Sequence, residues 1–271
     1  MIDISKLDYS AFDHPKITGL LFYPRREEGG PLSFGGSGET VLIPVEQDVF
    51  IGARLHLSGK EAANMLFFHG NGEIVSDYDD VGRLYTGMGI NFFPVDYRGY
   101  GQSTGRPTVT SMMRDGHVIF EYMTSWLRER QHSGPLIIMG RSLGSAPALE
   151  LASTYPDRID GLIIESGFAF AEPLLRLLGI NMEVLGVKEK EGVRNIDKIR
   201  KVDKPTLIIH AERDHIISFR EGELLFDASA NKEKRFLRIP GANHNDLFFR
   251  GLSSYLESVK WLVDKAAMER A

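Results

Sequence analysis

The sequence predicts an α/β fold whose core is a mostly parallel, doubly wound sheet. Two observations carry this prediction. Short apolar runs of strand length alternate with stretches of helical period along most of the chain, which is the pattern of βαβ units. Polar clusters follow directly after several of these runs, at the carboxyl ends of the strands, where doubly wound sheets bind their ligands.

Composition narrows the class of protein. A chain of 271 residues with 42% hydrophobic and 25% charged residues fits one large domain, or at most two small ones, with a well-buried core. A net charge of -5 without a basic stripe argues against nucleic acid as a partner. There is no cysteine, which excludes disulfides and thiolate catalysis. Neither a secretory signal nor a membrane-length apolar run is visible, so we expect a cytoplasmic protein without a stable membrane anchor.

The N-terminal region is expected to differ from the rest. Residues 1–38 are interpreted as an extension that ends in a Gly-rich loop, GGPLSFGGSG at 29–38. The regular domain then spans 39–271. Its first two strands, at 41–45 and 49–57, surround a short polar turn and predict an antiparallel hairpin.

The remaining elements alternate regularly. Helical patterns separate the later strands, and Ser218 followed by Glu221 predicts a capping box at the start of the penultimate long helix. A last helix places leucines, valines and a tyrosine on one face between 252 and 263. The later strands are predicted at 65–68, 90–95, 136–139, 159–164, 206–210 and 235–239.

The segment 140–144, Gly-Arg-Ser-Leu-Gly, lies between a predicted strand and a predicted helix. This is the context that a nucleophile elbow requires, with Ser142 as the nucleophile. A side chain at either glycine would collide with the neighbouring strand or helix, because the turn is tight and strained. The alternative is an ordinary Gly-rich turn between strand and helix.

A serine nucleophile needs a base and an orienting acid. His244 follows the last strand directly and is the candidate base, whereas His69 is expected to hold its own loop. Asp214, just after the strand at 206–210, is the candidate acid, with Glu212 as its nearest rival and Asp160 as a weaker one. No H-E-x-x-H or paired metal-ligand spacing appears, which disfavours a metal-dependent hydrolase.

Two backbone amides are predicted to form the oxyanion hole. One is the N–H of Leu143, the residue after the nucleophile, and the other is the N–H of Asn71 in the loop His-Gly-Asn-Gly.

Together these motifs make the span from Glu39 onward resemble the α/β-hydrolase superfamily. The motifs are His-Gly-Asn, Asp-x-Arg-Gly-x-Gly-x-Ser, Gly-x-Ser-x-Gly, a strand-end Asp and a late Gly-x-x-His. The resemblance implies eight strands, an antiparallel second strand, a Ser-His-Asp triad and no cofactor. Details of the motifs resemble the branch of small protein depalmitoylases and serine-peptidase-like hydrolases. Depalmitoylases of that branch carry a lipidated or anchoring N-terminal segment, which is not seen in this sequence.

The segment at about 168–203 occupies the place of the lid in this superfamily. Its first half is rich in Phe and Leu, so Phe168, Leu174 and Leu178 are predicted to line an acyl pocket. The alternative is a packed surface helix. Arg141 and Glu165 lie at the ends of strands that the resemblance implies are adjacent, so they either form an ion pair or are solvated separately.

We therefore predict a serine hydrolase that cleaves a carboxylic ester or thioester through an acyl-enzyme. Its partner is a small-molecule or acyl substrate. A peptidase or amidase with the same triad and a non-catalytic binding protein of the same fold are the alternatives. The sequence does not indicate the acyl chain length, the leaving group or the oligomeric state.

Overall fold

The computed structural model describes residues 2–27 and 38–270. Apart from Gly38, the predicted Gly-rich loop lies outside the described residues. Each of the eight predicted strands forms, and all eight join one sheet. Their bounds are β1 Glu39–Glu46, β2 Val49–Leu55, β3 Ala63–Phe68, β4 Ile90–Val95, β5 Leu136–Arg141, β6 Gly161–Glu165, β7 Thr206–Ala211 and β8 Lys234–Ile239.

The sheet has the order β1-β2-β4-β3-β5-β6-β7-β8. Strand β2 is antiparallel to both of its neighbours, and the remaining pairs are parallel. The predicted fold class and the antiparallel second strand are thus confirmed. The order reverses at β3, which lies between β4 and β5. A reversal of this kind leaves a crevice at the carboxyl ends of the strands.

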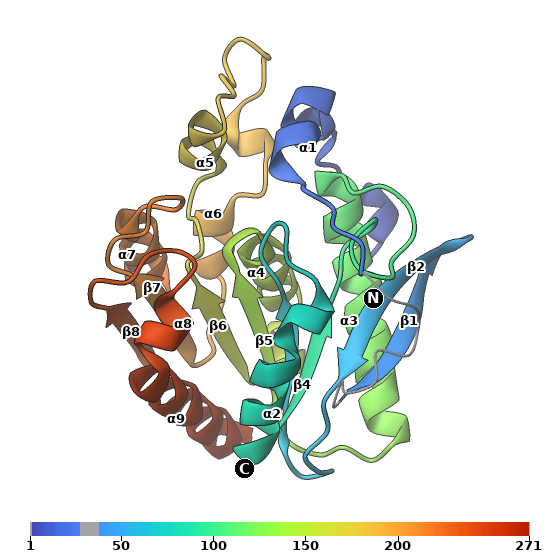
Figure 1. Ribbon diagram of the computed structural model, residues 1–271, viewed down its shortest axis with the longest axis vertical. Helices are drawn as coiled ribbons and strands as arrows, with labels where there is room; N and C mark the ends of the chain where they lie inside the picture. Colours follow the sequence, from blue (N-terminus) through green and yellow to red (C-terminus); the bar gives the residue numbers. More distant parts are fainter. Residues whose placement is uncertain (1, 28–37, 271) are drawn as a thin grey trace.

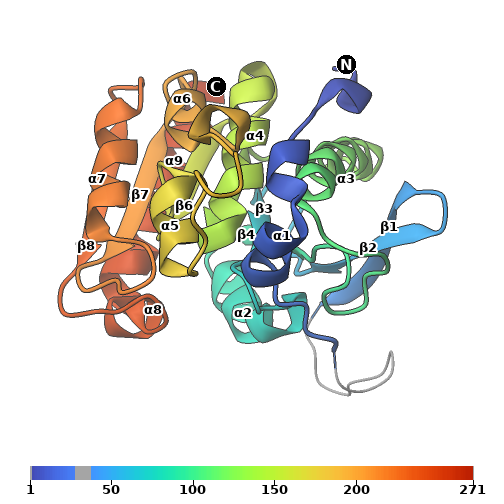
Figure 2. The same ribbon diagram turned by 90° about the horizontal axis from the view of Figure 1, so that it is seen from above.

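Helices cover both faces of this sheet (Figures 1 and 2). Helices α3 and α4 pack on one face, whereas α2 and α9 pack on the other. The bounds are α1 Pro15–Leu21, α2 Asp79–Gly87, α3 Val109–Glu129, α4 Ser145–Thr154, α5 Ala171–Leu177, α6 Asn195–Ile199, α7 Phe219–Ala228, α8 Leu247–Arg250 and α9 Leu252–Arg270.

Alternation along the central strands supplies two hydrophobic cores. In β3, Leu66 and Phe68 point into the core under α3 and α4, whereas Met65 and Phe67 point into the core under α2 and α9. All four side chains are almost completely buried. A strand buried on both faces reads as a continuous apolar run, which is why the sequence pattern identified it.

Residues 2–27 pack against the domain. Phe12 and Ile17 are buried in the core under α3 and α4. The Tyr9 hydroxyl donates to Glu150 Oε2 at 2.8 Å, and Lys198 Nζ pairs with the same oxygen at 2.7 Å. This buried carboxylate of α4 therefore holds together the N-terminal region and α6.

The predicted lid segment contains α5, a short 3-10 helix at Glu189–Glu191, and α6. Figure 1 places α5 and α1 beyond the carboxyl ends of the strands. Phe168 is 3% exposed and belongs to the core, whereas Leu174 and Leu178 are half-buried and pack against it. The segment is thus attached to the domain by its apolar side.

The predicted capping box at α7 does not form. Ser218 caps the helix by accepting a hydrogen bond from the Arg220 amide. Glu221 instead accepts from the amides of Ala169 and Phe170, at 2.9 and 3.0 Å. Burial explains the difference, because these two amides need an acceptor inside the protein, and the buried Glu221 provides it.

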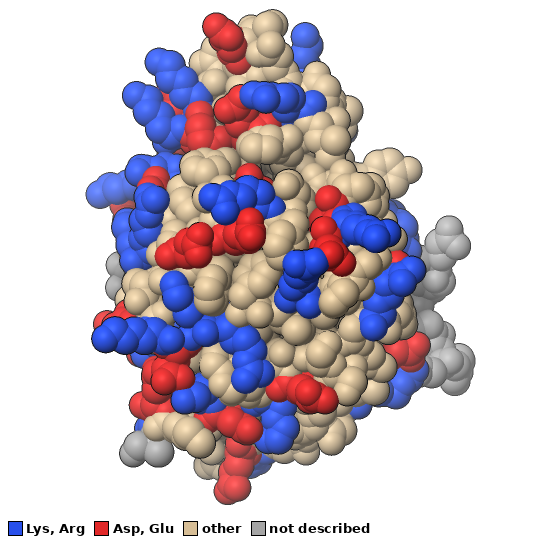
Figure 3. All heavy atoms as spheres, turned by 90° about the vertical axis from the view of Figure 1, so that its left-hand side faces the viewer, with Lys and Arg blue, Asp and Glu red and all other residues tan. Residues whose placement is uncertain are grey.

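Surface charge is mixed on the side shown in Figure 3, where β8, α7 and α9 lie in Figure 1. Basic and acidic side chains are interspersed there, without a broad field of one sign. Across residues 2–27 and 38–270, none of the helices combines the length and hydropathy that a membrane span needs.

Candidate active site

Ser142 lies on a strained turn between β5 and α4. Its φ angle is 52°, in the left-handed region that costs a residue with a side chain about 1–3 kcal/mol. A Cβ atom at Gly140 would lie 2.3 Å from the carbonyl oxygen of Gly144, and one at Gly144 would lie 2.1 Å from that of Phe68. The steric reason predicted for both glycines is confirmed.

His244 reaches this serine from the loop after β8. Its Nε2 lies 3.0 Å from Ser142 Oγ. The loop is closed by its own side chains, because Asp246 accepts from the Asn243 amide at 2.7 Å and Asn243 accepts from the Asn245 amide at 2.9 Å. The His244 residue is 3% exposed. The loop thus presents the ring in one defined position.

Asp214 completes the chain of hydrogen bonds. Its Oδ2 lies 2.7 Å from His244 Nδ1, and its Oδ1 accepts from the amides of Ile216 and Ile217 at 3.0 and 2.8 Å. Burial opposes ionisation of this carboxyl, but the hydrogen bond with His244 and the two amides outweigh burial and lower its pKa. The arrangement therefore favours a carboxylate facing the imidazole.

The two rival carboxylates are engaged elsewhere. Glu212 accepts from the Gly241 amide at 2.5 Å and pairs with Arg238. Asp160 accepts from the Leu136 amide at 2.7 Å, at the amino end of β5. Of the three candidates, Asp214 is the one that the structure brings to His244.

The loop after β3 is fixed by buried polar contacts. His69 Nε2 lies 3.2 Å from Asp96 Oδ1, and both side chains are fully buried, so His69 holds this loop as predicted. The Asn71 side chain accepts from the Tyr23 amide at 2.7 Å and from the Tyr100 hydroxyl at 2.6 Å. These bonds fix the position of residue 71, whose backbone N–H is the predicted second oxyanion donor.

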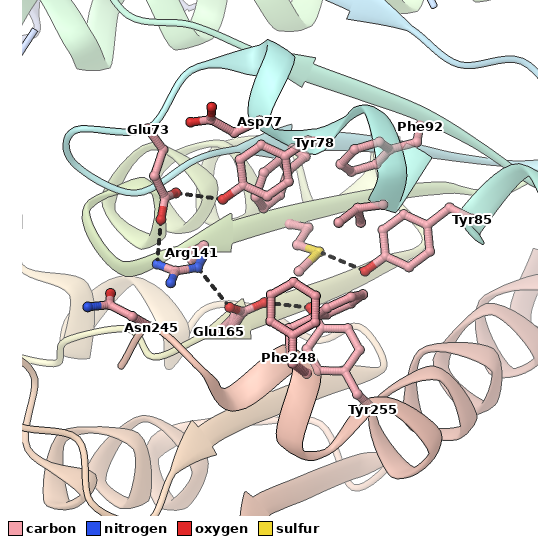
Figure 4. Close-up of a pocket in the computed structure, with 14 residues that line it drawn as sticks. Glu73, Asp77, Tyr78, Tyr85, Phe92, Arg141, Glu165, Asn245, Phe248 and Tyr255 are labelled. Carbon is pink, nitrogen blue, oxygen red and sulfur yellow. Dashed lines mark hydrogen bonds and ion pairs between the residues drawn. The ribbon is translucent and has the colours of Figure 1, made fainter. Parts of the chain in front are cut away.

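Arg141 forms a charged cluster with side chains from several elements (Figure 4). Its Nε lies 3.0 Å from Glu165 Oε1 and its Nη1 lies 2.9 Å from Glu73 Oε1, while Nη2 donates to the His244 carbonyl oxygen at 2.9 Å. The ion pair with Glu165 is thus the correct one of the two alternatives. The Tyr255 hydroxyl donates to the other oxygen of Glu165 at 2.5 Å.

Sequence reasoning missed Glu73 as a partner of Arg141 and Tyr255 as a partner of Glu165. Glu73 closes its own loop by accepting from the Gly70 amide at 2.6 Å. The only signal in the sequence was an acidic residue in a loop at the carboxyl end of a central strand. Tyr255 lies among the apolar residues of the last helix, and this pattern predicts a core residue.

A hydroxyl, an imidazole and a carboxylate in this order can transfer a proton from the serine as its oxygen attacks a carbonyl carbon. Within the described ranges, no three or more His, Asp or Glu side chains are placed to hold a metal ion. The chemistry that Ser142, His244 and Asp214 offer is nucleophilic and acid–base.

Known proteins with similar sequences include members of hydrolase families. Residues 59–188 match the family described as "Serine aminopeptidase, S33". Alpha/beta hydrolase domain-containing protein 17B from Homo sapiens is 32% identical over 212 residues, which cover 74% of this chain and 66% of that protein, just under two thirds. Protein bem46 from Schizosaccharomyces pombe is 27% identical over 222 residues, which cover 80% of this chain and 74% of that protein.

Solved structures share the fold. An esterase from Pyrococcus furiosus superposes with a TM-score of 0.71 at 16% sequence identity, covering 91% of this chain and 98% of that one. Est1E from Butyrivibrio proteoclasticus, solved with bound ferulic acid, gives a TM-score of 0.67 at 18% identity, covering 81% of this chain and 99% of that one. With this sheet topology and these relatives, the chain belongs to the α/β-hydrolase superfamily.

Proposed function

We propose that this protein cleaves a carboxylic ester or thioester through an acyl-enzyme formed on Ser142. The observation that carries the proposal is the continuous chain of two hydrogen bonds, from Ser142 Oγ to His244 at 3.0 Å and from His244 to Asp214 at 2.7 Å. One of the structures that share the fold is an esterase by name, which supports the choice of substrate class.

In the first half of the reaction, Ser142 Oγ attacks the carbonyl carbon and its proton passes to His244 Nε2. The negative charge that develops on the carbonyl oxygen is bound by the backbone N–H groups of Leu143 and Asn71. One such donor contributes about 3–4 kcal/mol to transition-state stabilisation. His244 then returns the proton to the leaving alcohol or thiol as the bond to it breaks.

In the second half, a water molecule attacks the acyl-enzyme. His244 accepts a proton from this water, the ester bond to Ser142 breaks, and the proton returns to Ser142 Oγ. The carboxylic acid is released and the enzyme is restored. Asp214 keeps its charge throughout and stabilises the imidazolium that forms twice in each cycle.

The acyl group is proposed to bind under the segment 168–203. Leu174 and Leu178 are half-buried at the edge of the core and offer apolar surface to a chain. Each methylene buried there contributes up to about 0.8 kcal/mol. Replacing both leucines with Ala should lower kcat/KM for medium acyl chains more than for acetate, and an unchanged ratio in the folded variant would place the acyl site elsewhere.

A peptidase or amidase with the same three residues is the second candidate, favoured by the description of the matching family. A fluorophosphonate probe tests the shared step, because it labels an activated serine and should label the wild type but not Ser142→Ala. Esters from acetate to palmitate, matching acyl thioesters and aminoacyl amides then separate the substrate classes. An unlabelled Ser142 in the folded protein would contradict both candidates.

A further inference from the structure

A cavity of about 200 Å³ lies on the face of the sheet that α2, α8 and α9 cover (Figure 4). Three exposed residues, Asp77, Asn245 and Phe249, lie at its mouth. Its inner end is formed by buried side chains of the sheet, among them Phe67 and Met139. The cavity is thus open to solvent at one end and apolar at the other.

This cavity is distinct from the Ser142 site. Met139 and Arg141 alternate with the residues of β5 that point toward α4, so both face α2 and α9. Ser142 begins the turn that leads into α4, on the opposite face. Neither Ser142 nor His244 is among the described residues that line the cavity. A ligand there would lie behind the catalytic residues.

The charges that line the cavity are unbalanced. Glu73, Asp77 and Glu165 face a single cation, Arg141. Asp77 also pairs with Arg25, which lies outside the lining, so one carboxylate charge remains without a counterpart.

Both inner carboxyls are hydrogen-bonded on each of their two oxygens. Glu165 accepts from Arg141 on one oxygen and from Tyr255 on the other, and Glu73 accepts from Arg141 and from Tyr78 in the same way. A carboxylate oxygen has two lone pairs. Oxygen Oε1 of Glu73 is therefore able to accept a further hydrogen bond from a ligand. Glu73 is 24% exposed in its side chain, which leaves it accessible.

The walls of the cavity, between its mouth and its inner end, are largely aromatic. Rings of Tyr78, Tyr85, Phe92 and Tyr255 line the cavity, and aromatic faces attract cations. An apolar cavity of about 150 Å³ in another protein holds benzene. A cavity of about 200 Å³ therefore has room for one ring with a short arm.

We propose that this cavity is a second binding site, for a small aromatic cation: one ring that packs against Phe92 and Tyr85, and an ammonium group that binds Glu73 and Glu165. The ligand restores the balance of charge, which a buried cluster with an excess carboxylate lacks. The inference goes beyond the proposed hydrolysis and does not depend on it.

The test measures binding of four small probes to the wild-type protein by NMR titration. Benzylamine carries both the ring and the charge, benzyl alcohol carries the ring alone, n-butylamine carries the charge alone, and benzoate carries the opposite charge. We expect benzylamine to bind at least tenfold more tightly than the other three. Nuclear Overhauser contacts from its ring to the methyl groups of Met139 and Val81 should locate it in the cavity.

Two variants with the same substitution on α2 give a matched control. Val81 lines the cavity, whereas Leu84 is 40% exposed on the same helix and does not line it. Val81→Phe should weaken benzylamine binding at least tenfold, and Leu84→Phe should leave it unchanged. The Ser142→Ala variant should bind benzylamine as the wild type does, which separates this site from the catalytic one.

Equal affinity for benzylamine and benzyl alcohol would overturn the proposal, as would contacts to residues outside the cavity. Both are read on the wild-type protein, so the test holds even where Val81→Phe does not fold. Loss of benzylamine binding in Ser142→Ala would likewise contradict a separate site.

Discussion

Arg141 and Ser142 are consecutive residues that belong to two sites of different construction. Around Ser142, three side chains form a line of two hydrogen bonds, and each lies on a turn that its own neighbours close. Around Arg141, one cation binds acceptors from the loops after β3 and β8 and from the end of β6. The first site is built from local turns, and the second from contacts between segments far apart in the chain.

The catalytic site depends on the contacts of Arg141. Arg141 Nη2 donates to the carbonyl oxygen of His244, while its Nη1 binds Glu73, which closes the loop that contains Asn71. The side chain that points away from the reaction thus fixes two of the loops that carry the reaction. Substitutions on the two sides should separate chemistry from stability.

The largest effect is expected at the nucleophile and the base. Ser142→Ala and His244→Ala should each lower kcat by about 10⁴–10⁶-fold, because members of a triad act as one unit. Thermal unfolding should remain close to that of the wild type, since neither side chain belongs to the charged cluster. Near-normal ester hydrolysis by either folded variant would remove that residue from the mechanism.

The next effect is expected at the acid. Asp214→Asn should lower kcat by about 10⁴-fold, because an amide no longer stabilises the imidazolium or selects the reactive tautomer of His244. Glu212→Gln is the matched control, two residues away in the same loop, and should leave kcat unchanged because its carboxylate contacts Arg238 and Gly241. The opposite result would exchange the roles of the two carboxylates.

On the other side of β5, substitution of Arg141 is expected to lower the stability of the fold. Arg141→Met leaves two carboxylates without their cation and should lower the free energy of unfolding by about 3–5 kcal/mol. Arg158→Met removes a half-exposed pair with Glu121 and should cost no more than about 1 kcal/mol. Urea unfolding of both variants gives the comparison, and equal losses would show that burial of the Arg141 cluster contributes nothing.

This contrast also explains what could be predicted from the sequence. Ser142, Asp214 and His244 each follow a strand of recognisable period, so the topology brings them to one edge of the sheet. The strands were recognisable because both faces are buried. Glu73, by contrast, contacts Arg141 through tertiary packing, as Tyr255 contacts Glu165, and no spacing in the sequence encodes either contact. Glu221 could not be predicted for the same reason. Its carboxylate binds the backbone amides of Ala169 and Phe170, which lie far from it in the sequence, and does not cap its own helix.

The smallest effect distinguishes the two carboxylates that bind Arg141. Burial opposes ionisation of Glu73, but Arg141 and the Tyr78 hydroxyl outweigh it and lower the pKa of this carboxyl. Burial raises the pKa of Glu165, which Arg141 and Tyr255 only partly offset. Ionisation of Glu73 therefore stabilises the fold at neutral pH, whereas ionisation of Glu165 opposes folding.

Glu73→Gln should accordingly lower the free energy of unfolding at pH 7 by about 1.5–3 kcal/mol, the range for hydrogen bonds to charged groups, and Glu165→Gln should cost less. A carboxyl with a lowered pKa stabilises the folded state above its unfolded-state pKa, about 4.3, and this contribution is lost as the pH falls through the folded-state value. The difference between wild type and Glu73→Gln should thus shrink below about pH 4. Urea unfolding at pH 7, 5 and 3.5 measures it, and a difference that is constant with pH would mean that Glu73 acts by shape and not by charge.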